Sequence, residues 1–195
     1  VWCVVVFVFF FRIRRPPRST RFPYPTLSRS KRVVEVKGKV VTPGIIDLHT
    51  HVYSGVTDNG VDPDIGGVRA GVTTMVDAGS SGCDTFAGFP AHIIPNTATE
   101  IICFLHICRT GLATNPDIFS PESINLDKTI ETIKGSNGVI TGVKARMVSP
   151  ALEIMGMEMP RMAKRAAVEA GVPLMGHIGD TLKRQIGRAS CRERV

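Results

Sequence analysis

Short apolar runs alternate with longer segments of helical pattern between residues 32 and 185. Each run is rich in β-branched residues and apolar at successive positions, which is typical of a strand buried on both faces. Strands of this kind, separated by helices, indicate parallel βαβ units. Gly or Pro lies at several ends of the helical segments, where it favours a helix start or stop. The strand runs cover residues 44–51, 72–79, 100–107, 138–147 and 172–179, and the helix candidates cover 62–71, 85–94, 126–138 and 159–171. We expect prolines to break the candidate at 85–94.

The spacing of the strand runs sets the expected α/β architecture. From Gly44 onward, strand starts fall about 28 to 38 residues apart, which is the length of a βα repeat. A closed (β/α)8 barrel needs eight such units and about 250 residues. We therefore predict either the N-terminal part of a TIM-type barrel, about strands 1 to 5, or a five-stranded open sheet.

Residues 33–41 (VVEVKGKVV) show a different pattern, because apolar and polar positions alternate. Alternation predicts a half-buried strand, which we interpret as the last strand of a small β-sandwich element. Thr42-Pro43-Gly44 follows it and predicts a type II turn, with Pro at i+1 and Gly at i+2. We place the end of the small β element at residues 31–43 and the partial barrel at residues 44–186.

The two ends of the chain differ in composition from its middle. The formal charge is +7, but residues 1–30 hold six Arg and no acidic residue, and residues 187–195 hold three Arg and one Glu. The remaining residues hold 15 basic and 16 acidic side chains, which gives no sign of a nucleic-acid partner. Both ends resemble translated sequencing-adapter DNA, and we interpret them as non-native segments. The alternative is a basic arm that binds nucleic acid.

Targeting and thiol patterns favour a cytoplasmic protein without a membrane partner. Residues 1–11 are apolar, but a bilayer span needs about 20 residues, and a signal peptide carries its charge ahead of the apolar run. Between the two ends, the cysteines are Cys83, Cys103 and Cys108. Their odd number and spacing fit neither a zinc ribbon nor a disulfide framework. We interpret them as core thiols in a reducing compartment.

Two histidines follow the first barrel-type run, in GIIDLHTHV (residues 44–52). Side chains at i and i+2 of a strand point to the same face, so His49 and His51 can offer two imidazoles to one metal ion. The alternative for either is a histidine bonded within the core. Asp47 shares their face and could orient a metal ligand, although a buried structural hydrogen bond is an equal alternative.

Lys144 lies among apolar neighbours in the run 138–147, where burial would penalise its charge and lower its pKa. A neutral lysine amine can add CO2 to form a carbamate, whose two oxygens can bridge two cations. The alternative is an exposed lysine on an edge strand. His177 ends the next run. Since barrel active sites assemble at the C-terminal ends of strands, we predict that both side chains lie beside the two histidines.

Weaker candidates also lie at strand ends. His106 ends the run 100–107, and Asp77 lies near the end of the run 72–79. We consider His106 a candidate for substrate binding and Asp77 a candidate for orienting a ligand. Arg109, just beyond His106, could pair with a substrate carboxylate. We interpret His92, in a helical segment, as a surface or packing residue.

Together these motifs resemble the amidohydrolase superfamily of metal-dependent hydrolases. The resemblance rests on PGIIDLHTH (43–51), the strand-borne lysine of GVKARM (142–147) and GHIG (176–179), and it covers about residues 32–186. VTTMVDAGS and GVKARM are most similar to the dihydroorotase-like amidohydrolase/deacetylase branch. The resemblance favours a partial barrel over an open sheet.

The resemblance implies a cofactor and a reaction. It implies two divalent metal ions, expected to be zinc, with His49 and His51 holding the more buried ion, carboxylated Lys144 bridging both, and His177 binding the second. The implied reaction is hydrolysis of an amide or ester bond in a small molecule by metal-activated hydroxide. N-acyl amino acids and cyclic amides are the expected substrates, and homo-oligomerisation of the whole protein is compatible with the family.

The family also uses a histidine after strand six and an aspartate after strand eight, the latter as ligand and general base. We expect no strand between Asp180 and the adapter-like tail, so the catalytic base is not assigned to a residue of this chain. We expect the chain to be inactive by itself and the whole protein to be an enzyme. The alternatives are a mononuclear deaminase, which does not need Lys144, a non-catalytic barrel, and an inert barrel fragment.

Overall fold

The computed structural model describes residues 34–178, which form two units divided between Thr42 and Pro43. The predicted adapter-like segments lie outside the described residues. In the first unit, residues 34–42 contain a turn in which Lys39 N donates to Val36 O over 2.9 Å and Gly38 has a φ of +77°. These residues form no strand, so the prediction of a strand over 33–41 is wrong for the part that the structure describes.

The predicted strand does not form because the described residues offer it no neighbouring strand. A strand is stable only when a neighbour takes up its backbone N–H and C=O groups, and none of the described residues pairs with this segment. The chain turns at Gly38 instead, and the predicted type II turn at Thr42-Pro43-Gly44 is absent because Gly44 does not have the positive φ that position i+2 requires.

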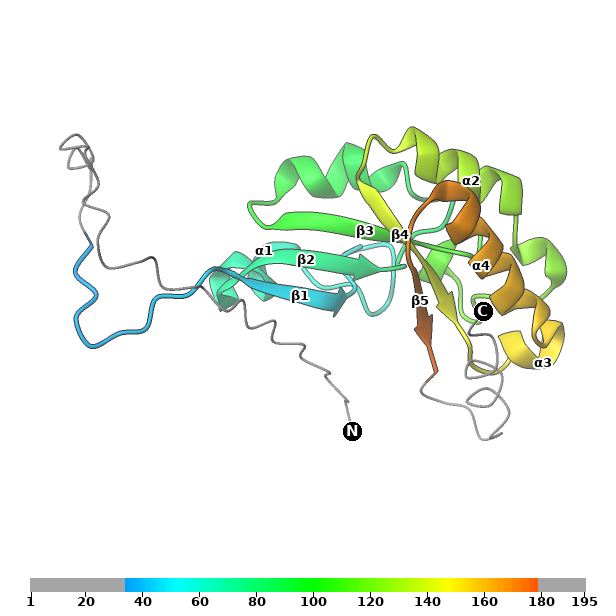
Figure 1. Cartoon of the computed structure of the whole chain (residues 1–195), viewed down its shortest axis with the longest axis horizontal. Coiled ribbons are helices and arrows are strands. Elements are labelled where there is room, and N and C mark those ends of the chain that lie inside the picture. Colours follow the sequence, from blue (N-terminus) through cyan, green and yellow to red (C-terminus); the bar gives the residue numbers. More distant parts are fainter. Residues whose placement is uncertain (1–33, 179–195) are drawn as a thin grey trace, which may run out of the picture. The chain divides into compact units, whose positions relative to one another are not determined.

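The second unit is built on one parallel sheet of five strands, which curls into a half-barrel consistent with part of a TIM barrel (Figure 1). The strands lie side by side in chain order, and each pairs in parallel with the next. All five predicted strand runs are therefore confirmed. The strands are β1 (Ile45–Thr50), β2 (Val72–Ala78), β3 (Glu100–His106), β4 (Ile140–Arg146) and β5 (Leu174–His177).

The helices of the second unit lie on the outer face of the sheet (Figure 1). The two longest, α2 (Leu126–Gly135) and α4 (Glu158–Ala170), confirm the predicted helices in these regions. Asn125 begins α2 by accepting a hydrogen bond from Lys128 N (3.0 Å), and Gly171, at a φ of +72°, ends α4. The shorter helices are α1 (Pro63–Gly66) and α3 (Ala151–Met155).

One predicted helix is shorter than expected, and prolines break another, as predicted. The segment 62–71 holds only α1 and a 3-10 turn, Val68–Ala70. The segment 85–94 ends in a π-helical turn, Phe89–Ile93, followed by a 3-10 turn, Ile94–Asn96. Pro90 and Pro95 lack the N–H that a continuous α-helix needs, which explains the irregularity. Further 3-10 turns cover Gly111–Ala113 and Pro121–Ser123.

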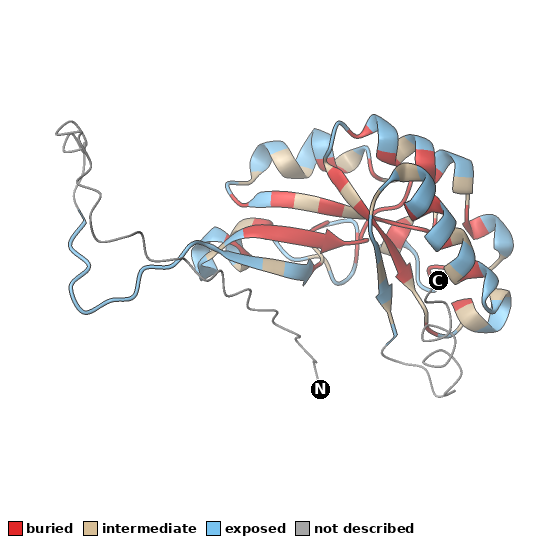
Figure 2. Cartoon of the chain, in the orientation of Figure 1, coloured by how far each residue is buried: buried red, intermediate tan, exposed pale blue. Residues whose placement is uncertain are grey.

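The core lies between the sheet and the helices (Figure 2). In β3 and β4, alternate residues face the helices and are buried, whereas most of β1 is exposed and no residue of β5 is fully buried. All three described cysteines are buried and free, as predicted for core thiols. Among residues 34–178, no helix is long and apolar enough to cross a membrane. The fully buried core residues contributed by β3, β4 and α4 include Cys103, Leu105, Val143, Ala145, Met159, Ala163 and Ala166.

Candidate functional site

Alternation along β4 decides which of its side chains reach the candidate site. Val143 and Ala145 pack in the core beneath the helices, so Lys144 and Arg146 project from the opposite face of the sheet. Strand register then sets their neighbours. Lys144 lies level with His106 of β3, and Arg146 lies level with His177 of β5.

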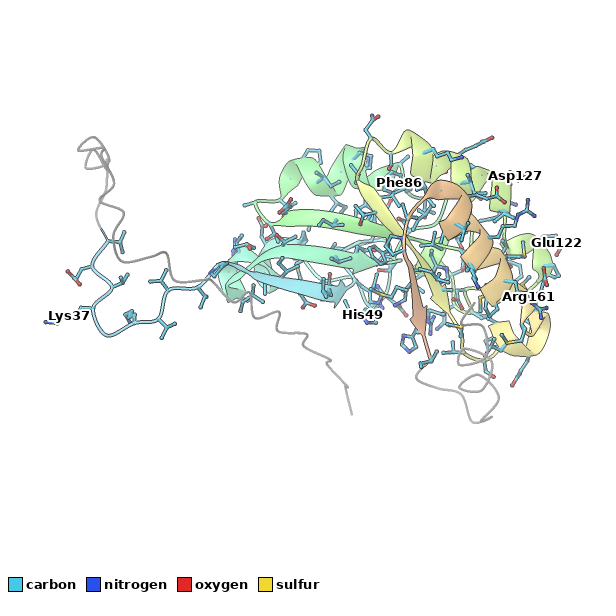
Figure 3. All side chains as sticks on the ribbon, viewed as in Figure 1. Lys37, His49, Phe86, Glu122, Asp127 and Arg161 are labelled. Atoms are coloured by element: carbon cyan, nitrogen blue, oxygen red, sulfur yellow. The ribbon has the colours of Figure 1, made fainter. Side chains whose placement is uncertain are left out.

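His49 lies at the centre of the site, at the arrow end of β1 (Figure 3). Its ring centroid is 5.6 Å from that of His51 and 6.1 Å from that of His177. Its Nε2 is 3.3 Å from Nζ of Lys144, although the two residues are 95 positions apart in the chain. The structure thus brings together the four side chains that we expected at one site. Their role as metal ligands stays a prediction.

The His51 imidazole is held in a neutral state. Its Nδ1 lies 3.0 Å from the hydroxyl oxygen of Ser80, which leaves Nε2 as the nitrogen available to a metal ion. Burial lowers the pKa of His51 to about 3, and the charges of His49 and Lys144 act in the same direction. Burial also lowers the pKa of His49. Both rings are therefore unprotonated at neutral pH, as metal coordination requires.

Asp77 positions Ser80 rather than a histidine directly. Its fully buried carboxylate accepts hydrogen bonds from Ser80 N (2.7 Å) and from Val52 N (2.9 Å). It therefore ties the loop after β2 to the residue that follows His51. Asp47 has a more local contact, since it accepts from the backbone N–H of His49 (3.1 Å). That either carboxylate orients a ligand stays a prediction.

Lys144 has an unusual environment for an amine. The residue is 1% exposed, and its Nζ contacts His49 Nε2 and, at 3.4 Å, the sulfur of Met175. Neither partner is an anion. Burial lowers the pKa of Lys144 to about 8, and the positive charge of Arg146 lowers it further than Asp77 can raise it. The amine therefore lies much closer to its neutral form than an exposed lysine does.

The donor set can be tested for its fit to metal ions. Within the described part of the chain, no three His, Cys, Asp or Glu side chains are close enough to hold a metal ion. Three imidazoles and an amine also supply no negative charge to balance a divalent cation. An anionic carboxylate added to Lys144 would supply both the charge and two oxygen ligands. The residues therefore fit a metal site that includes a modified lysine.

His106 lies beside this site but is completely buried. Cys108 N donates to its Nδ1 (3.0 Å), so the ring proton is on Nε2, which lies 3.3 Å from Oδ2 of Asp117. Asp117 would favour a charged ring. Full burial has the larger effect and, together with the nearby positive charges of Arg146 and Lys144, lowers the pKa of His106 to about 3. A role of His106 in substrate binding stays a prediction, and it requires the ring to become accessible.

Acid should destabilise the protein through His106. Below pH 6.5 the unfolded chain binds a proton on this residue that the folded chain excludes until about pH 3, so the free energy of unfolding falls as the pH drops through that window. Between pH 7.5 and 5.5 we expect a loss of about 1.4 kcal/mol from this residue. Urea denaturation of the metal-free whole protein at several pH values measures it.

The variant His106→Asn should flatten that pH dependence, whereas His92→Asn, at an exposed position, should leave it unchanged. Because His49 and His51 contribute in the same direction, the informative quantity is the difference in slope between wild type and variant. Equal slopes would show that His106 is protonated alike in the folded and unfolded chains.

Arg109 lies on the loop after β3 and is already paired. Its Nε is 2.9 Å from Oδ2 of Asp84, whose Oδ1 is 2.6 Å from Nζ of Lys128. Its predicted contact with a substrate carboxylate stays a prediction. The structure instead draws attention to residues that we did not predict. Arg146 could have been found from the sequence, since it lies two positions after Lys144, but Ser80 and Asp117 carry no such signal.

Comparison with known proteins adds to this geometry. The amidohydrolase family model matches residues 40–187. A curated protein of Brucella anthropi named deacetylase is 35% identical over 150 residues, covering 75% of this chain and 37% of the relative. A solved structure described as a dihydroorotase matches with a TM-score of 0.65 at 35% identity, covering 71% of this chain and 38% of that chain. A structure described as an adenine deaminase matches with the same TM-score at 26% identity, with the same coverage of both chains. The chain spans a little over a third of the length of these proteins.

Proposed function

The chain belongs to the amidohydrolase family, and from this premise we propose that the whole protein is a metal-dependent hydrolase of amide or ester bonds in small molecules. Family membership and the deacetylase relative support hydrolysis of a C–N bond, with N-acyl amino acids and cyclic amides as the substrates to test. The observation that carries the proposal is the environment of Lys144. Its buried amine lies against His49, and no carboxylate among the described residues bonds to it.

A carbamate on Lys144 is the first element of the proposal. The neutral amine nitrogen attacks the carbon of CO2, one C=O π pair moves onto oxygen, and the nitrogen releases one proton to solvent, which leaves an N-carboxylate with a single negative charge. Because the pKa of Lys144 is lowered to about 8, a much larger fraction of the amine is neutral near pH 7.5 than in an exposed lysine. For an unperturbed lysine the neutral fraction is roughly one part in a thousand. The local environment thus favours this reaction.

The other site residues would complete the metal centre. His49 and His51 would hold one divalent ion, expected to be zinc, His177 would hold a second, and the carbamate oxygens would bind both. Such ions supply hydroxide near neutral pH and polarise a scissile carbonyl. The chain itself keeps the His49 and His51 imidazoles neutral by burial and orients His51 through Ser80. We assign the proton transfer to no described residue.

Metal analysis and a substrate panel test this proposal on the full-length protein. We expect about two divalent ions per protomer and hydrolysis of at least one class among N-acetyl amino acids, cyclic amides and acetyl esters. A chelator should abolish the activity, and zinc with bicarbonate should restore it. A full-length protein that binds no divalent metal, or that binds metal without hydrolysing any of these classes, would refute the proposal.

A mononuclear deaminase is the second candidate, favoured by the match to the adenine deaminase structure. It would keep the histidines but would have no need of a modified lysine. It predicts one tightly bound ion and release of ammonia from an aminopurine. The same metal analysis, with an ammonia assay on adenine, distinguishes the two candidates.

A further inference from the structure

We propose that Arg146 binds an anionic group of the substrate and so selects acidic over neutral substrates, and that Asp117 positions it. This inference rests on the proposed function, since it concerns substrates of the same site. It differs from the sequence-based expectation, which gave this task to Arg109.

Arg146 lies where a substrate group can reach it. It is the last residue of β4, projects from the same face as Lys144, and pairs in register with His177. Its side chain is 29% exposed, whereas Lys144 and His106 on the same face are almost completely buried. Among the charged side chains on this face of β4, Arg146 is therefore the accessible one.

Asp117 contacts only one nitrogen of the Arg146 guanidinium. Its Oδ1 lies 3.7 Å from one terminal nitrogen of Arg146, which is longer than a good hydrogen bond. Its other oxygen, Oδ2, faces His106 at 3.3 Å. A guanidinium carries five N–H donors in a planar fork, so most of the Arg146 donors stay available to a ligand.

Asp117 is itself firmly placed. It is 2% exposed, and its backbone oxygen accepts a hydrogen bond from the thiol of Cys108 (2.7 Å). Its carboxylate faces His106 at the end of β3 and Arg146 at the end of β4, and Oδ2 has no hydrogen-bond partner among the described residues. Asp117 therefore attracts Arg146 by its charge without neutralising it at short range.

Arg109 and Arg146 differ in the charge that they can offer a substrate. Arg109 makes a 2.9 Å contact with Asp84, although Asp84 is shared with Lys128. Arg146 has a long contact to its carboxylate and lies beside the histidine and lysine side chains of the site. A planar carboxylate matches the guanidinium fork, which makes a carboxylate beside the scissile acyl group the expected anion.

The test uses the full-length protein and two matched substrates, the best N-acetyl amino acid of the panel and its primary amide. Replacing Arg146 by methionine should lower kcat/KM for the acid by about 10- to 100-fold and change kcat/KM for the amide by less than about threefold. Arg146→Lys should fall between, because it keeps the charge but not the fork. Asp117→Asn should lower the ratio of kcat/KM for the acid to kcat/KM for the amide, but by less than Arg146→Met does.

Arg161→Met is the control, since Arg161 lies on α4, on the outer face of the sheet (Figure 3). It should leave the ratio unchanged. If Arg146→Met lowers kcat/KM equally for the acid and the amide, Arg146 has only a structural role. The inference is then overturned, while the proposed function stands.

Calorimetric titration of the acid and the amide into metal-free protein separates the two proposals further. Loss of acid binding in Arg146→Met supports the inference even if the wild-type protein hydrolyses neither compound, in which case the proposed function alone fails. Unchanged acid binding in Arg146→Met overturns the inference.

Discussion

Replacing Lys144 in the full-length protein is expected to reduce kcat/KM by more than about 100-fold and to remove bound metal. Even residues that only support a metal ligand typically contribute 10- to 100-fold, and we propose Lys144 as a bridging ligand. In the structure this lysine is buried, contacts His49 and has a lowered pKa, all of which favour a carbamate. Metal content by mass spectrometry and hydrolysis of the best panel substrate measure the effect.

The choice of substitution matters because Lys144 is also a packed side chain. Lys144→Met keeps the apolar stem and removes only the amine, whereas Lys144→Ala also leaves a cavity. Lys134→Met, at an exposed position on α2, is the control and should keep both metal and activity. A Lys144→Met protein with two ions and normal activity would contradict the carbamate. One tight ion with full activity would favour the mononuclear deaminase.

The sheet could be predicted from the sequence because its strands form short apolar runs at the spacing of βα repeats. Runs such as residues 100–107 and 138–147 are apolar over most of their length, and each begins and ends close to where β3 and β4 do. The polar residues within these runs therefore stood out. Lys144 and His106 lie level with each other on one face, as expected for side chains at the ends of parallel strands.

Where the structure depends on the partners of the backbone hydrogen bonds, the sequence was a poorer guide. The alternating pattern of residues 33–41 is compatible with a strand, but it cannot show whether another strand pairs with it. The break in the helical segment 85–94 was predictable, because Pro90 lacks a backbone N–H, but the change to π and 3-10 turns was not. In both segments the backbone hydrogen bonds decided the structure.

Parts of the site were not predictable because they join distant segments. Ser80 contacts His51 from 29 positions away, and Asp117 faces Arg146 from a long loop. Nothing in the sequence near Ser80 or Asp117 distinguishes them from other polar residues. Arg146 differs, because the same alternation that identified the face of Lys144 applies to it two positions later.

A substitution at Gly79 is expected to destabilise the protein strongly. Its φ is +89°, and an added Cβ would lie 2.7 Å from both Cβ and Cγ of Lys144 and 3.1 Å from Cδ2 of His106. Gly79→Ala should therefore combine backbone strain of roughly 1 to 3 kcal/mol with overpacking of roughly 1 to 3 kcal/mol. The expected loss in the free energy of unfolding is about 2 to 6 kcal/mol, measured by urea denaturation of metal-free protein.

The variant Gly138→Ala separates the cost of backbone strain from the cost of overpacking. Gly138 has nearly the same φ, +85°, but nothing lies within 4 Å of its added Cβ, so that variant should show the backbone strain alone. Because the Gly79 methyl group must displace Lys144, Gly79→Ala should also lower the metal content of the protein, and Gly138→Ala should not. Equal losses of stability in the two variants, with normal metal content in both, would show that the lysine does not pack against Gly79. If only Gly79→Ala loses metal, the turn after β2 is what holds the lysine against His49.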